Sequence, residues 1–127
     1  MYLLDTNIIL EILFGQKNAE KCYDFIYAHQ NQELFLTDFA YFSISVKLFN
    51  FKKYSVSEDL RYEFIDTRII TIIKLELGDW EKIIQVSSKY NFDFDDSYQF
   101  VAAEKYNLKI VSYDKDFDLT SVKRLIP

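Results

Sequence analysis

The chain is poor in the residues that usually interrupt or crosslink a fold. Its 127 residues include only 2 Gly, 1 Pro, 1 Cys and 1 His. Because turn-forming residues are so few, we expect short connections between helices and strands. Cys22 has no second cysteine for a disulfide within the chain, which fits a reducing compartment. The single His29 gives little support to a histidine zinc site or to a Ser-His-Asp triad.

Long apolar runs and an excess of basic residues are also missing. No run approaches the about 20 apolar residues that a membrane-spanning helix needs. The N-terminus lacks a basic segment followed by an apolar stretch, so we predict no signal peptide and expect a cytoplasmic protein. The net charge of −5 argues against a general nucleic-acid binder, which would carry a basic face. The negative charge leaves open an enzyme whose carboxylates hold cations that in turn bind phosphate groups.

What the chain does have is a large supply of core residues. Hydrophobic residues make up 50% of it, with 12 Phe and 10 Tyr, which excludes a disordered chain. The length suits one domain and is short for two, so we expect a single domain over 1–127. The aromatic residues exceed what a core of this volume needs, and exposed apolar patches mark partner surfaces. We therefore predict a homodimer formed through the aromatic helices within 37–66.

Segments with strand-like and helical patterns alternate along the chain. Buried strands are predicted at 1–5, 33–37, 68–73 and 108–112, with a short fifth at 122–126. Helices are predicted at 6–13, 17–31, 37–51, 55–66, 79–90 and 93–106, the last one stopped by Asn107. This alternation predicts a three-layer α/β/α fold with a central parallel sheet of four to five strands.

Acidic residues follow three of the predicted strands. Asp5 comes after the first, Asp38 after the second, and Asp114 with Asp116 after the fourth. In an open parallel sheet, ligands bind beyond the carboxyl ends of the strands. We therefore expect these carboxylates to lie along one edge of the sheet.

Two further acids, Asp95 and Asp96, begin the helix that leads into the fourth strand, so they are expected at the same edge. An acid at a helix start can simply cap backbone N–H groups, a contribution of about 0.3–1 kcal/mol. We expect Asp95 to be such a cap. Capping does not predict that all these acids converge. Metal-assisted phosphodiester hydrolysis uses such a cluster, because Mg²⁺ and Mn²⁺ take oxygen ligands and further carboxylates orient the attacking water.

Two segments of the chain resemble the PIN-domain family. LLDTNIIL at 3–10 is similar to the family's opening, in which a strand ends in Asp and Thr-Asn follows. DDSYQFVAAEKYNLKIVSYDKDF at 95–117 is similar to its third and fourth motifs. The overall length resembles the VapC-type toxins of bacterial and archaeal toxin–antitoxin pairs. This resemblance implies a Mg²⁺- or Mn²⁺-dependent endoribonuclease with an RNA substrate, an antitoxin protein as partner, and a homodimeric state.

The resemblance also implies which residues form the site. Asp5 and Asp96 would lie nearest the metal, with Asp114 as the fourth acid and Asp116 as its neighbour, so the predicted ligands are these four. The family's second motif usually contains a Glu within a helix, but none occurs from 34 to 57, where Asp38 is the only acid. We therefore predict the catalytic set Asp5, Asp38, Asp96 and Asp114. The alternative is a PIN-like binding protein whose site no longer cleaves.

Other enzyme classes fit the sequence less well. DFDLT at 116–120 matches the Asp-x-Asp-x-Thr nucleophile pattern of haloacid-dehalogenase phosphatases, but that motif should open a domain and here it lies near the end. A phosphoacceptor receiver domain would need its acidic pair after the first strand. Neither a GxxxxGKT-type loop nor a GxGxxG motif occurs, so nucleotide-binding folds of those kinds are not supported.

Overall fold

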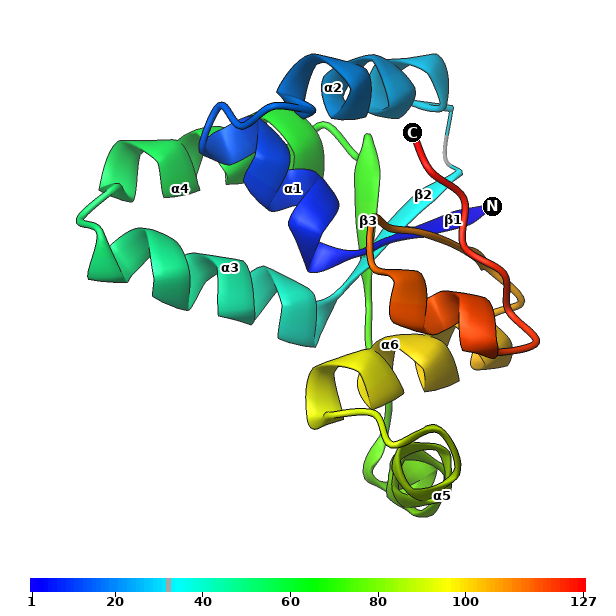
Figure 1. Cartoon of the computed structure of the whole chain (residues 1–127). Coiled ribbons are helices and arrows are strands. Elements are labelled where there is room, and N and C mark those ends of the chain that lie inside the picture. The colour runs from blue at the N-terminus through cyan, green and yellow to red at the C-terminus, as the bar shows by residue number, and fades with distance from the viewer. Residues whose placement is uncertain (32) are drawn as a thin grey trace.

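The computed structural model describes residues 1–31 and 33–127 and has a parallel sheet between two layers of helices (Figure 1). The strands are β1 (Tyr2–Leu4), β2 (Leu34–Thr37), β3 (Ile70–Ile73) and β4 (Lys109–Val111), in the order β3-β2-β1-β4. Every neighbouring pair is parallel, with Tyr2 opposite both Leu34 and Lys109. The predicted three-layer parallel α/β fold is confirmed.

The segment predicted as a fifth strand forms only a single parallel bridge. Leu125 pairs with Val111, donating its N–H to the Ile110 carbonyl at 2.7 Å and accepting from the Ser112 N–H at 3.0 Å. This bridge places the C-terminal segment against β4, on the side away from β1. The sheet therefore has the lower of the two predicted strand numbers.

The helices occupy nearly the predicted segments. They are α1 (Thr6–Leu13), α2 (Ala19–Ala28), α3 (Asp38–Asn50), α4 (Tyr54–Leu60), α5 (Trp80–Tyr90) and α6 (Phe94–Lys105). The helix predicted over 55–66 is divided, because α4 continues as a π-helical turn over Arg61–Asp66. Short 3₁₀ turns occur at Leu77–Asp79, before α5, and at Lys115–Leu119, after β4. Within the described residues, no helix is long and apolar enough to cross a membrane.

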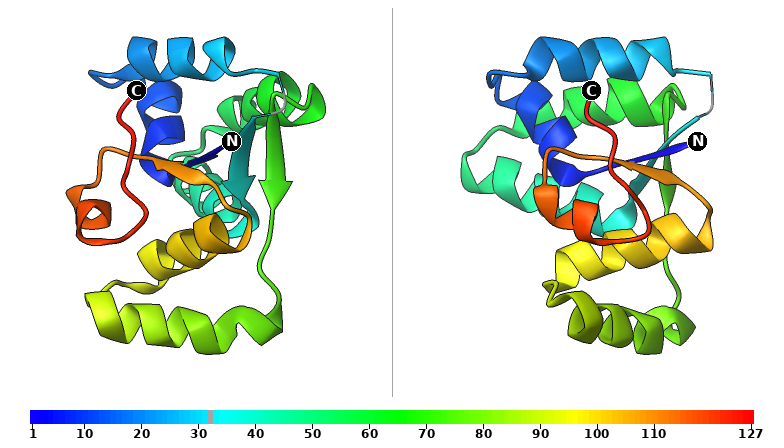
Figure 2. Two further views of the ribbon diagram at one scale, coloured as in Figure 1. Left: turned by 90° about the vertical axis from the view of Figure 1, so that its right-hand side faces the viewer. Right: turned by 45° about the vertical axis from the view of Figure 1, so that its right-hand side comes forward.

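Two hydrophobic cores lie on opposite faces of the sheet, because neighbouring strand residues point to opposite sides. Leu4, Leu36 and Val111 pack against α1, α2, α3 and α4, whereas Leu3 and Ile110 pack against α5 and α6. Figures 1 and 2 show the same division, with α5 and α6 together on one side of the sheet. Helix α6 is buried along most of its length, from Ser97 to Ala103. It therefore holds a fixed position between α5 and the sheet.

The loops bring several helix starts to the carboxyl edge of the sheet. Asp5 links β1 directly to α1, and Thr37 caps α3 immediately after β2 by accepting from the Ala40 N–H at 3.0 Å. At the opposite edge, Asn107 adopts a left-handed conformation with φ of 53°, which ends α6 as predicted and turns the chain into β4. This connectivity places the start of α6 near the strand ends.

Candidate functional site

Three carboxylates from two distant segments lie close together beyond the carboxyl edge of the sheet. Asp96 comes from the first turn of α6, and Asp114 and Asp116 come from the 3₁₀ turn after β4. One oxygen of each carboxylate lies within 4.8 Å of the others. Asp114 also accepts from the Asp116 N–H at 2.9 Å, which keeps both side chains within one tight turn. The structure thus brings together three of the acids that the sequence analysis selected.

Asp5 is buried beside these acids and is held by hydrogen bonds. Only 4% of this residue is exposed. Its Oδ2 accepts from Asn7 Nδ2 at 2.7 Å and from the Ser112 hydroxyl at 2.5 Å, and its Oδ1 accepts from Gln99 Nε2 at 2.8 Å. The Ser112 hydroxyl in turn accepts from the Asp114 N–H at 2.8 Å. Ser112 therefore connects Asp5 at the end of β1 to the turn that carries Asp114.

Burial and nearby negative charges raise the pKa values of Asp96 and Asp5. The pKa of Asp96 is raised to about 7, mainly by burial and then by the negative charges of Asp93, Asp114 and Asp5. Burial also raises the pKa of Asp5, although hydrogen bonds from Ser112 and Gln99 oppose the rise. A nearby cation would favour the charged forms of these groups. The electrostatics therefore suit a bound divalent ion.

The donor set also fits such an ion. Carboxylate oxygens are the ligands that Mg²⁺ and Mn²⁺ prefer. Two oxygens bound directly at about 2.1 Å lie at most about 4.2 Å apart, so the observed spread of up to 4.8 Å admits an ion after small side-chain rotations or through one bridging water. Within the described residues, the buried side-chain oxygens without a hydrogen-bond partner belong to Thr6, Ser97 and Gln99. Thr6 and Ser97 directly follow Asp5 and Asp96 in the sequence. Hydroxyl groups without a hydrogen-bond partner therefore occur next to both acids along the chain.

Asp38 lies outside the three-carboxylate group. Its Oδ1 accepts from the Tyr98 hydroxyl at 2.7 Å and from the Phe39 N–H at 2.7 Å. The Tyr98 oxygen accepts in turn from the Leu75 N–H at 3.0 Å. Burial, followed by the bond to Asp38, raises the pKa of Tyr98 to about 12, so this residue stays a hydroxyl donor. Asp38 is thus attached to α6 from the start of α3.

The cap of α6 is an acid other than the predicted Asp95. Asp93 is the cap, because its carboxylate accepts from the Asp96 N–H at 2.9 Å, whereas Asp95 accepts from Gln99 Nε2 at 3.1 Å. The spacing of Asp93 and Asp96, three residues apart, is the usual one for a side-chain cap and could have indicated this. Asp95 has a raised pKa, chiefly through burial, and Asp5 is among the charges that raise it. The hydrogen bonds that Gln99 and Ser112 donate to Asp5 were not predicted from the sequence.

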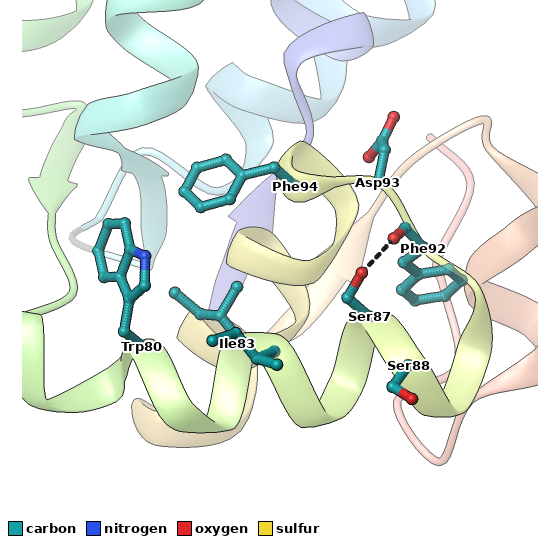
Figure 3. Close-up of a pocket in the computed structure, with 8 residues that line it drawn as sticks. Trp80, Ile83, Ser87, Ser88, Phe92, Asp93 and Phe94 are labelled. Atoms are coloured by element: carbon teal, nitrogen blue, oxygen red, sulfur yellow. Dashed lines mark hydrogen bonds between the residues drawn. The ribbon is translucent and has the colours of Figure 1, made fainter.

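An apolar pocket lies between α5 and the start of α6 (Figure 3). Its volume is about 390 Å³, and Trp80, Ile83, Phe92 and Phe94 form much of its wall. The Ser87 hydroxyl donates to the Phe92 carbonyl at 2.6 Å, which fixes the loop at one end (Figure 3). Asp93 is the one acid among its lining residues, and Asp96, Asp114 and Asp116 do not line it.

Comparison with known proteins identifies the class to which this fold and site belong. The family model for the PIN domain matches residues 2–123, so the chain belongs to the PIN-domain family. No curated protein sequence matches the chain.

Similar structures share the fold over nearly the whole chain. A toxin–antitoxin complex from Klebsiella pneumoniae contains a chain with 20% identity and a TM-score of 0.77, covering 100% of this chain and 98% of that one. The Mycobacterium tuberculosis toxin VapC20, described as cleaving the sarcin–ricin loop, has 11% identity and a TM-score of 0.79, with 100% of both chains covered. A protein from Pyrobaculum aerophilum has 15% identity and a TM-score of 0.65, over 97% of this chain and 89% of that one. At these identities the likeness establishes the fold.

Proposed function

We propose that this chain is a Mg²⁺- or Mn²⁺-dependent endoribonuclease and the toxin of a toxin–antitoxin pair. The observation that carries the proposal is the group of Asp96, Asp114 and Asp116 beside the buried Asp5. Membership of the PIN-domain family supports it. Two similar structures, one a toxin–antitoxin complex and the other a toxin described as cleaving the sarcin–ricin loop, support the biological role.

In this proposal the residues of the site divide into carboxylate ligands and the groups that orient them. A bound divalent ion would supply Lewis acidity and lower the pKa of water for attack on a phosphodiester. Asp96, Asp114 and Asp116 would hold the ion, with Asp5 as a further ligand. Asn7 and Ser112 orient Asp5 through their hydrogen bonds to Oδ2, as partners behind metal ligands commonly do.

Asp38 is the proposed replacement for the Glu of the second family motif. Its hydrogen bonds from Tyr98 and Phe39 both fall on Oδ1, which leaves Oδ2 to orient a water. The same contacts favour a second candidate function, a PIN-like binding protein that no longer cleaves, because they hold Asp38 outside the three-carboxylate group. Cleavage by the purified protein decides between the two.

The test is the cleavage of a panel of structured RNAs in the presence of Mg²⁺, Mn²⁺ or EDTA. We expect cleavage with either ion, none with EDTA, and loss of cleavage in Asp5→Asn and Asp96→Asn. Asp24→Asn is the matched control, because Asp24 is an exposed acid on α2 that does not belong to the group of Asp96, Asp114 and Asp116. Cleavage that persists in EDTA or in Asp5→Asn would reject the proposal. A folded wild type without activity under any condition would favour the binding protein.

We also propose an antitoxin partner and a homodimer. Phe42, Val46 and Phe49 lie on one face of α3 and are 61%, 60% and 55% exposed. Phe51, directly after this helix, is 62% exposed. Exposed apolar residues that are contiguous on a helix face indicate a protein interface.

A further inference from the structure

The side-chain amide of Gln99 lies between two carboxylates. Its Nε2 donates to Asp5 Oδ1 at 2.8 Å and to Asp95 Oδ1 at 3.1 Å. Asp95 is one helical turn before Gln99 on α6, whereas Asp5 directly follows β1 and is 94 positions from Gln99 in the chain. The amide therefore joins the first turns of α6 to the end of the central strand.

The orientation of this amide is determined by charge. Rotating it by half a turn would place its carbonyl oxygen against two acceptors, which would repel it. In the observed orientation, Gln99 Oε1 is buried and has no hydrogen-bond partner within the described residues. An unsatisfied buried carbonyl destabilises the folded state. The folded protein thus contains a destabilising carbonyl at the same amide whose NH₂ group lies between Asp5 and Asp95.

The hydrogen bonds on Asp5 are unevenly divided between its two oxygens. Among the described residues, two side chains, Asn7 and Ser112, donate to Oδ2, whereas Gln99 is the one side chain that donates to Oδ1. Each carboxylate oxygen has about two acceptor positions. Oδ1 is therefore the oxygen with room for a further ligand, and Gln99 is the residue that sets its direction.

We propose that Gln99 is a positioning residue of the carboxylate site, which aims Asp5 Oδ1 at the ion and holds Asp95 beside it. This inference rests on the proposed function, because it assumes that the site binds a divalent ion. The donated hydrogens partly offset the repulsion between Asp5 and Asp95, so both carboxylates stay close in one arrangement. The Asp95 bond keeps the Gln99 side chain extended toward Asp5, since the two residues share one face of α6.

A purely structural role for Gln99 would have a different signature. If its amide only attached α6 to β1, replacing it would lower stability and leave the folded protein's affinity for metal unchanged. If it positions Asp5, metal affinity falls even where stability is retained. Replacing groups that orient metal ligands typically weakens binding or activity by about 10- to 100-fold. The affinity of the folded protein for Mn²⁺ is therefore the decisive measurement.

The experiment measures Mn²⁺ binding by isothermal titration calorimetry in wild type, Gln99→Met and Gln99→Asn. Met keeps the length of the side chain without a donor, and Asn keeps the amide but withdraws it by one methylene. Gln85→Met is the matched control, because Gln85 is exposed on α5. We expect the Mn²⁺ Kd to rise at least about 10-fold in both Gln99 variants and to stay unchanged in Gln85→Met. RNA cleavage lost at low Mn²⁺ should partly return at high Mn²⁺.

The outcomes separate this inference from the proposed function. Wild-type protein that fails to bind Mn²⁺ would reject the proposed function and with it the role of Gln99. Wild-type protein that binds Mn²⁺, together with folded Gln99 variants of unchanged affinity, would reject the role of Gln99 alone. Circular dichroism and thermal melting establish that each variant is folded. If Gln99→Met does not fold, Gln99→Asn carries the test, because the smaller amide fits the same space.

Discussion

The Tyr98 hydroxyl donates a hydrogen bond to Asp38 Oδ1 at 2.7 Å, across 60 positions of the chain. It connects the one acid near the family's second motif to α6, the helix that also carries Asp96. Asp38 is therefore anchored close to the site without belonging to the three-carboxylate group. Whether this residue contributes to cleavage can be tested separately from whether the protein cleaves RNA at all.

Replacing Asp38 by Asn should reduce RNA cleavage by about 100-fold or more if its charge orients the attacking water. Stability should change little, because the Asn carbonyl can still accept from Tyr98 and Asn is well tolerated at helix starts. Single-turnover cleavage rates and thermal melts measure the two effects. Unchanged cleavage in Asp38→Asn, with cleavage abolished in Asp5→Asn, would mean that the site works through the other acids, without Asp38.

The stability of the metal-free protein should fall as the pH rises. The pKa of Asp96 is about 7 in the folded protein, above the ordinary value of 3.8 for an unfolded chain. Between these two pKa values the folded state binds more protons than the unfolded state. The stability that protonated Asp96 contributes is therefore complete below about pH 4 and is lost as the pH approaches 7. In EDTA, wild type should melt at a higher temperature at pH 5 than at pH 8. Asp96→Asn should show a smaller difference, and an equal difference in both proteins would contradict the assignment.

Divalent ions should raise the melting temperature, because the carboxylates of Asp96, Asp114 and Asp116 come together only in the folded state. At a free ion concentration of 100 times Kd, the expected stabilisation is about 2.7 kcal/mol. Differential scanning fluorimetry with increasing Mg²⁺ or Mn²⁺ measures it, with NaCl of equal ionic strength as the control. The shift should disappear in Asp96→Asn combined with Asp114→Asn. A wild type that shows no shift at millimolar ion would count against a metal site.

The exposed face of α3 should hold two copies of the chain together. We expect light scattering at micromolar concentration to give the mass of a dimer for wild type and of a monomer for Phe49→Asp. Ile84→Asp is the matched control, because Ile84 is 63% exposed on α5, in the other helical layer. It should remain a dimer. A monomeric wild type would remove this interface from the proposal.

The layers and their order could be read from local patterns in the sequence. The strands predicted at 1–5, 33–37, 68–73 and 108–112 are all present, within two residues at either end. Such patterns work because a strand buried on both faces is apolar throughout, whereas a helix repeats its apolar residues every three or four positions. The segment 122–126 is apolar enough to predict a strand, but it forms only the bridge of Leu125. A strand also needs backbone partners on a neighbouring strand, which the pattern of the segment itself does not indicate.

For the site as well, one part could be predicted from the sequence and another part could not. Since parallel strands end at one edge, the sequence by itself determined that Asp5, Asp96 and Asp114 belong to one region of the molecule. Only the tertiary structure decided that Asp38, which was expected at the same edge, is hydrogen-bonded to Tyr98 and lies outside the group of Asp96, Asp114 and Asp116. These details depend on how α6 packs on the sheet and on which side-chain rotamers bring donors to acceptors. Local periodicity carries no information about hydrogen bonds between residues 60 or more positions apart, such as those of Asp38 and Asp5.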